Sequence, residues 1–318
     1  MISRRSVLTA LSAAAMAPVK TAPPAFAGGP AVGSQVPGFF RIQVGGIAVT
    51  ALLDGYLDLA PEIFAGAAQE TIANAAARSP QSRPLRGSVN AFVIDTGSRR
   101  VIVDAGGPTS FAPSLGRFSD NLASAGIDPA SVDEIIVTHL HIDHIGGLTS
   151  AHVPTFPNAG LTLSETEHGF WMSPGLLDGA SDEFRPFVSA AQNAVAAFGN
   201  RLNIVASDAD LGGGLSLLPL PGHTPGMIGV QISDGADLLL MWADLVISPA
   251  LQFAHPEWSA AFDVDADEAV ATRRRVLDMT AADRIPVIGS HLPFPGHGFV
   301  TRAESAYRYE PADWQFHD

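Results

Sequence analysis

The sequence predicts a single α/β domain, and three features support this. Its 318 residues are 47% hydrophobic and only 16% charged, which is enough apolar material for one large core. Short apolar runs typical of strands alternate with amphipathic segments typical of helices. Several of the apolar runs end directly at a His or an Asp. In α/β sheets, ligands bind at the carboxyl ends of the strands, so a functional site is expected there.

The expected elements begin with a hairpin in which Gly45 and Gly46 form the turn between strands at 40–44 and 47–53. An Ala-rich region at 58–86 is expected to hold loops and a short helix near the mouth of a pocket. Helices are expected at 115–125, 165–172 and 185–199, and from Asp265 or Asp267 to about 282, with the arginines at 273–275 mostly on the solvent side. The other expected strands are 89–94, 101–103, 132–138, 161–164, 202–206, 215–220, 227–232, 238–242 and, as the last of the domain, 285–289.

The N-terminus predicts an export signal. Arg4 and Arg5 precede an apolar, Ala-rich run, as in a twin-arginine signal, and the segment 25–27 (AFA) has the form of a cleavage site. The expected organisation is a signal peptide at 1–27, a Gly/Pro-rich linker at 28–37 and one folded domain at 38–318. The apolar run is too short to span a bilayer permanently, so a periplasmic or secreted protein without a membrane anchor is expected. The alternative is a disordered basic tail.

Charge and cysteine content exclude several classes of function. The chain has 18 Lys and Arg against 32 Asp and Glu, a net charge of −14, which argues against a nucleic-acid partner. A small neutral or weakly polar substrate is expected instead. There is no Cys, which excludes disulfides, thiolate nucleophiles and Cys-ligated zinc or iron–sulfur sites.

Histidines and aspartates at the predicted strand ends indicate a metal site. The segment 139–144 (HLHIDH) places three imidazoles and one carboxylate within six residues. His223 lies in a rigid PGHTPG turn, Asp244 follows an apolar strand, and His291 follows the last predicted strand. Imidazole and carboxylate ligands suit zinc and similar divalent ions. Asp104 also follows a predicted strand, where it would either orient a metal-binding His or simply form a turn.

This combination resembles the metallo-β-lactamase fold superfamily over essentially the whole mature chain. The resemblance implies a four-layer αββα sandwich with two divalent metal ions, zinc being the expected ion. It implies that one ion is held by His139, His141 and His223, that the other is held by Asp143, His144 and His291, and that Asp244 bridges the two.

Within the superfamily, the chain looks most like the methyl parathion hydrolase group. The supporting segments are 111–117 (FAPSLGR), 167–171 (EHGFW), 251–253 (LQF) and 289–296 (GSHLPFPG). The resemblance implies that a metal-bridging hydroxide attacks organophosphate triesters, aryl esters or lactones. Asp143 or Asp244 would hold the hydroxide and carry a proton. Phe111 and Trp171 would form an aromatic wall for an apolar substrate, their other reading being core residues, and a homodimer is implied.

Two alternatives remain open. One is an N-acyl-homoserine lactone lactonase, although many of those enzymes carry a Tyr three residues after the bridging Asp, where this chain has Ile247. The other is a non-hydrolytic metal-binding or redox member of the same fold. Such members usually have extra Glu ligands, and Ile142 between His141 and Asp143 leaves no Glu there. A β-lactam substrate is not expected, because the chain lacks Cys and has Asp244.

Overall fold

The structure is a computed structural model that describes residues 35–80 and 84–315. A compact unit begins at Pro37. The predicted signal peptide at 1–27 and most of the predicted linker lie outside the described residues. Within the described ranges, no helix combines the length and apolar character needed to cross a bilayer.

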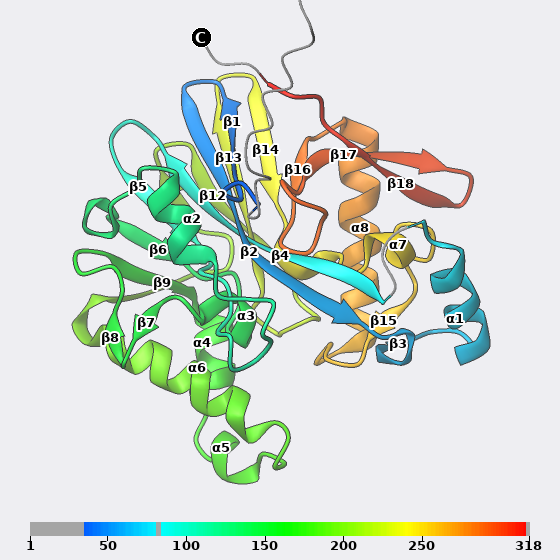
Figure 1. The fold of residues 1–318 in the computed structure, drawn as a ribbon, viewed down its shortest axis with the longest axis horizontal. Coiled ribbons are helices and arrows are strands. Elements are labelled where there is room, and N and C mark those ends of the chain that lie inside the picture. The colour runs from blue at the N-terminus through cyan, green and yellow to red at the C-terminus, as the bar shows by residue number, and fades with distance from the viewer. Residues whose placement is uncertain (1–34, 81–83, 316–318) are drawn as a thin grey trace, which may run out of the picture. The chain divides into compact units, whose positions relative to one another are not determined.

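Two mixed sheets form the centre of the unit, each with seven strands among the described residues (Figure 1). The first sheet has the order β1 (Phe39–Val44), β2 (Ile47–Leu59), β4 (Leu85–Asp95), β5 (Arg100–Val103), β6 (Glu134–Ile136), β9 (Gly160–Ser164) and β10 (Leu202–Val205). The second has the order β11 (Asp210–Gly212), β12 (Leu215–Pro219), β13 (Ile228–Asp234), β14 (Asp237–Met241), β16 (Val287–Ile288), β17 (His297–Ala303) and β18 (Ala306–Pro311). Two short pairs lie outside them, β3 (Phe64–Ala65) with β15 (Ser259–Ala260) and β7 (Thr149–Ser150) with β8 (Val153–Pro154).

The α-helices in the described residues are α1 (Gln69–Arg78), α2 (Phe118–Ser124), α3 (Ile142–Ile145), α4 (Glu165–Trp171), α5 (Leu176–Gly179), α6 (Arg185–Phe198), α7 (Pro249–Gln252) and α8 (Ala266–Asp283). Of these, α2, α4 and α6 pack on the first sheet and α8 packs on the second. Strand periodicity divides the core: in β4, Phe92 and Ile94 face the second sheet, while Ala91 and Val93 face the side of α2 and α6. On the far side of the second sheet, Val276 and Leu277 of α8 pack against it. The layers are therefore helix, sheet, sheet and helix, as the family resemblance implies.

Most predicted elements are confirmed, with small differences at their ends. Gly45 and Gly46 form the first turn, and Asp265 caps α8 by accepting a hydrogen bond from the backbone N of Glu268 (2.9 Å). The helix predicted from 115 begins only at Phe118. Before it, the Asp54 carboxylate binds the backbone N of Gly116 and of Phe118, which holds this segment as a loop.

Two expectations are wrong. Arg273 is 1% exposed rather than on the solvent side, and its guanidinium donates to the carbonyls of Leu245, Pro256 and Trp258. The strand at β16 is also not the last, because the hairpin β17–β18 follows it. In β17 the exposed face includes Phe299 beside the buried Val300, so hydrophobicity does not alternate with burial along this strand.

Sheet topology brings the predicted strand ends together. In the first sheet β5 and β6 are parallel, and in the second sheet β14 and β16 are parallel. Parallel neighbours end at the same edge of a sheet, so the residues that follow them are close in space although distant in sequence.

Candidate metal centre

The predicted metal ligands converge from both sheets. In the first sheet, β6 leads to the segment 139–144. In the second, β14 leads to Asp244 and β16 leads to His291, while His223 lies in the connection between β12 and β13. Gly146 lets the turn after the cluster pack closely, since a Cβ there would lie 2.6 Å from the backbone of Gly107.

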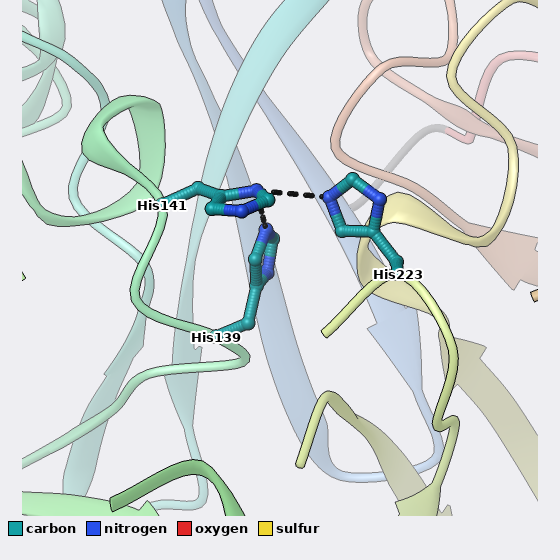
Figure 2. A group of neighbouring side chains, drawn as sticks. All are labelled: His139, His141 and His223. Carbon is teal, nitrogen blue, oxygen red and sulfur yellow. Dashed lines mark hydrogen bonds between the residues drawn. The ribbon is translucent and has the colours of Figure 1, made fainter. Parts of the chain in front are cut away.

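The imidazoles of His139, His141 and His223 form a first group, shown in Figure 2. His141 Nδ1 lies 3.1 Å from His139 Nε2 and 3.0 Å from His223 Nε2. We call these three residues group 1.

Group 2 consists of Asp143, His144 and His291, whose candidate ligand atoms lie within 4.8 Å of one another. Asp244 lies between the groups. Its Oδ2 is 3.4 Å from His223 Nε2 and 2.8 Å from His291 Nε2, and its Oδ1 is 3.2 Å from His144 Nε2. This is the place that the resemblance assigns to a bridging carboxylate.

Four of these histidines have a partner on the outer ring nitrogen. The partners are Thr138 Oγ1 for His139 (3.1 Å), Asp104 Oδ2 for His144 (2.7 Å), Asp263 Oδ1 for His223 (2.8 Å) and the Ser88 carbonyl for His291 (2.7 Å). Carboxylates and carbonyls only accept, and the Thr138 hydroxyl already donates to Asp104. Each Nδ1 therefore carries a proton, and each Nε2 faces the centre. Outer partners of this kind are typical of metal-binding histidines.

The centre requires positive charge. His144 Nε2 and Asp244 Oδ1 are buried and have no hydrogen bond of good geometry to any described residue. Burial lowers the pKa of His144, but the carboxylates of Asp244, Asp143 and Asp104 outweigh burial and raise this pKa well above its ordinary value. Burial raises the pKa of Asp244, but the neighbouring imidazoles, first that of His144, bring it well below its ordinary value.

In group 1, two histidines have lowered pKa values, in contrast to the raised pKa of His144. Burial, with the neighbouring imidazoles, lowers the pKa of His139 and of His141 well below the ordinary value. His141 Nδ1 lies within 3.1 Å of both His139 Nε2 and His223 Nε2, and one proton cannot satisfy all three nitrogens, so they are available as metal ligands. The donor set of imidazole nitrogens and carboxylate oxygens thus fits two divalent ions of the zinc type.

A cavity of about 560 Å³ opens onto this cluster. Its floor includes His141, Asp143, His223, Asp244 and His291. Its walls are largely apolar and include Leu57, Ile63, Phe111, Phe184, Phe187, Ile247, Phe262 and Val264. Phe111 meets Phe187 edge to face, with ring centroids 5.8 Å apart.

Trp171, predicted as part of the aromatic wall, does not line this cavity. It is the last residue of α4 and is fully buried in the core with residues of α6. Its indole Nε1 donates to Glu167 Oε1 (2.7 Å), and its ring meets that of His141 edge to face, with centroids 5.8 Å apart. The cavity wall on that side comes instead from Phe184 and Phe187. Trp171 is therefore a core residue, the alternative that the sequence left open.

Asp104 contacts the cluster rather than serving only a turn. Its backbone is left-handed (φ 60°), a conformation that Asp tolerates better than most residues. One carboxylate oxygen accepts from the Thr138 backbone N (2.9 Å), and the other accepts from the Thr138 hydroxyl (2.8 Å) and His144 Nδ1 (2.7 Å).

Two important carboxylates were missed from the sequence. Asp263 stands two residues before the predicted cap Asp265, and nothing in that acidic stretch distinguishes the residue that binds His223. Glu167 is fully buried and accepts hydrogen bonds from the Leu140 backbone N, next to His139, and from the Thr224 hydroxyl, next to His223. A helix-starting Glu gave no sign of this role.

Comparison with known proteins agrees with this geometry. The family model of the metallo-beta-lactamase superfamily matches residues 84–291. The chain is similar to the crystal structure of the hydrolase AbOPH of the beta lactamase superfamily, at 29% identity and a TM-score of 0.83 over 89% of this chain and 100% of that one. It is also similar to AidC, a dizinc quorum-quenching lactonase, at 26% identity and a TM-score of 0.82 over 88% of this chain and 99% of that one.

A curated relative, the Beta-lactamase-like protein 2 homolog of Drosophila melanogaster, is 33% identical over 72 residues. That match spans 23% of this chain and 23% of the relative's length.

Proposed function

The chain belongs to the metallo-beta-lactamase superfamily, and from this we propose that it is a dinuclear metal-dependent hydrolase of uncharged organophosphate triesters and aryl esters. The observation that carries the proposal is the convergence of group 1, group 2 and Asp244 at the floor of one apolar cavity.

Two bound divalent ions would supply Lewis acidity, lowering the pKa of water and polarising a phosphoryl or carbonyl oxygen. The protein's own residues do the rest. Asp143 and Asp244 both line the cavity floor, where a carboxylate oxygen can accept a proton from water and return it to a leaving group. The outer partners of the histidines fix which ring nitrogen faces the centre, so the ligands need little rearrangement.

The cavity favours neutral substrates. Among its lining residues in the described part of the chain there is no Lys or Arg, whereas Asp58 and Glu183 lie at its walls. An anionic substrate would gain no side-chain cation there and would approach these carboxylates. Phe111, Phe187 and Phe262 offer apolar surface to an aryl or alkyl group.

Lactone hydrolysis is the second candidate, supported by the similarity to AidC, a quorum-quenching lactonase. Ile247 lines the cavity and offers no hydroxyl to a lactone carbonyl. For this reason we place phosphotriesters and aryl esters first. A methyl parathion hydrolase-like subtype is part of the same proposal.

The test uses purified protein loaded with zinc. Metal content is measured, and turnover is compared for an aryl phosphotriester, an aryl ester, an acyl-homoserine lactone and a β-lactam. The expected result is two metal ions per chain and hydrolysis of the first two substrates. Asp244→Ala should lose metal and all of these activities. Full activity with one metal ion or none would refute the dinuclear mechanism.

We also propose that the protein is exported through the twin-arginine route to the periplasm or beyond, and that it forms a homodimer. Changing Arg4 and Arg5 to Lys should leave the precursor in the cytoplasm, as fractionation and immunoblotting would show. Unchanged export would contradict the first proposal, and a monomer in sedimentation experiments would contradict the second.

A further inference from the structure

We infer that Glu167 is a positioning residue that sets the geometry of group 1 and leaves group 2 unaffected. The inference rests on the proposed dinuclear site. It assigns a role to a residue that touches neither substrate nor any candidate ligand atom.

Glu167 lies in the first turn of α4, and its side chain is fully buried. Its Oε1 accepts hydrogen bonds from the Leu140 backbone N (2.8 Å) and from Trp171 Nε1 (2.7 Å). Its Oε2 accepts from the Thr224 hydroxyl (2.7 Å) and from the Gly226 backbone N (3.2 Å). Four donors therefore converge on one carboxylate.

These donors connect the two segments that carry group 1. Leu140 stands between His139 and His141, and Thr224 follows His223 directly. The contact is close, because a Cβ on Gly226 would lie 2.0 Å from the Glu167 backbone N. One side chain thus joins the end of β6 in the first sheet to the turn before β13 in the second.

Burial of this carboxylate is unfavourable by itself. No Lys, Arg or His forms an ion pair with Glu167 among the described residues, and burial raises its pKa. Neutral donors alone stabilise it, and two of them are backbone N–H groups of the ligand-bearing segments. A residue that is costly to bury at this junction fits a role in placing His141 and His223.

Group 2 has separate supports. His144 is held by Asp104, and His291 is held by the Ser88 carbonyl. Glu167 makes no hydrogen bond to either of these supports. A change at Glu167 should therefore reach one metal position and not the other.

Glu167→Gln is the informative substitution, because it keeps the shape of the side chain. An amide has one acceptor oxygen, and its NH₂ donates. In either orientation of the amide, the NH₂ faces the backbone N–H of Leu140 or of Gly226. One segment of group 1 then loses its anchor. Loss of such an outer contact typically weakens metal affinity by about 10- to 100-fold.

The experiment measures zinc affinity by competition with a chromophoric chelator in two backgrounds. The His291→Ala background breaks group 2 and leaves group 1 intact. The His223→Ala background breaks group 1 and leaves group 2 intact. Glu167→Gln is expected to weaken zinc binding by about 10- to 100-fold in the His291→Ala background and to have no effect in the His223→Ala background. The visible spectrum of the cobalt-loaded protein should change only in the first background.

Glu134→Gln is the matched control. Glu134 also accepts two side-chain hydrogen bonds, from Arg99 and Thr162, but it lies at the amino end of β6, away from the cluster. It should leave zinc affinity unchanged in both backgrounds. If Glu167→Gln does not fold, Thr224→Val removes a single donor and should weaken zinc binding in the same background, to a smaller extent.

Equal losses in both backgrounds, or no loss in the His291→Ala background, would overturn the assignment of Glu167. A wild-type protein that binds two zinc ions without turnover would refute the proposed function and leave this inference intact. A wild-type protein that binds no zinc would refute both.

Discussion

Asp104→Ala tests whether the support behind the metal ligands is also a support of the fold. The substitution removes the acceptor of the Thr138 backbone N and of His144 Nδ1, both of which are buried. A buried donor left without a partner costs about 1–3 kcal/mol. The free energy of unfolding of the metal-free protein should therefore fall by about 2–6 kcal/mol, and zinc affinity should fall by about 10- to 100-fold.

Urea unfolding followed by circular dichroism measures the first quantity, and chelator competition measures the second. Asp133→Ala is the control, because the Asp133 carboxylate also accepts from a backbone N, that of Arg100, at an exposed position (2.8 Å). The control should lose less than about 1 kcal/mol. The reasoning would be refuted if Asp104→Ala lost no more than the control and kept its zinc affinity.

Three further predictions follow from the described contacts. Phe111→Ala should raise KM for an aryl substrate at unchanged stability, whereas Trp171→Ala should destabilise the fold by about 3–5 kcal/mol. If both substitutions raised KM without loss of stability, Trp171 would be part of the cavity wall after all. Arg273→Met leaves the buried carbonyls of Leu245 and Pro256 without a donor, while the Trp258 carbonyl keeps Gln252 Nε2. The free energy of unfolding should fall by about 2 kcal/mol or more, seen as a lower melting temperature in a thermal scan. An unchanged melting temperature would contradict this. The pKa values of His144 and His291 are raised in the metal-free protein, so both stay protonated above the ordinary pKa of 6.5 and must lose protons to bind zinc. Calorimetry in buffers of different ionisation enthalpy should detect proton release on zinc binding at pH 7. Zinc affinity should fall as the pH drops below the raised pKa values of the two histidines. Zinc binding without proton release would show that these pKa values are not raised.

The α/β class and the candidate ligands could be predicted from the sequence because both leave local signals, whereas the four layers were implied by the family resemblance. Strand periodicity, the Gly45–Gly46 turn and the dense segment 139–144 are each visible within a few residues. Asp244 and His291 were predicted because each follows an apolar strand, and parallel neighbours such as β14 and β16 end at one edge.

The outer contacts were not predictable in the same way. Asp263 and Glu167 act through partners 40 and 57 residues away, on His223 and Thr224. No local pattern distinguishes a carboxylate that meets such a partner from one that caps a helix. Trp171 shows the same limit, since its helix could have turned the indole toward either the cavity or the core. Arg273 was misplaced because long-range carbonyl acceptors made burial of a guanidinium possible.

The division of the candidate ligands between two sheets affects the order in which the molecule can be assembled. Residues 139–144 emerge early in synthesis, but their partner His291 follows β16, close to the end of the domain. A nascent chain that stops before β16 carries residues 139–144 but lacks His291, so its group 2 is incomplete. In the proposed dinuclear centre, group 2 would therefore become complete only after the segment that follows β16 has been synthesised. Two bound ions would link residues that follow strands of both sheets, and they would oppose unfolding by a free energy that grows with the logarithm of the ratio of free ion concentration to dissociation constant.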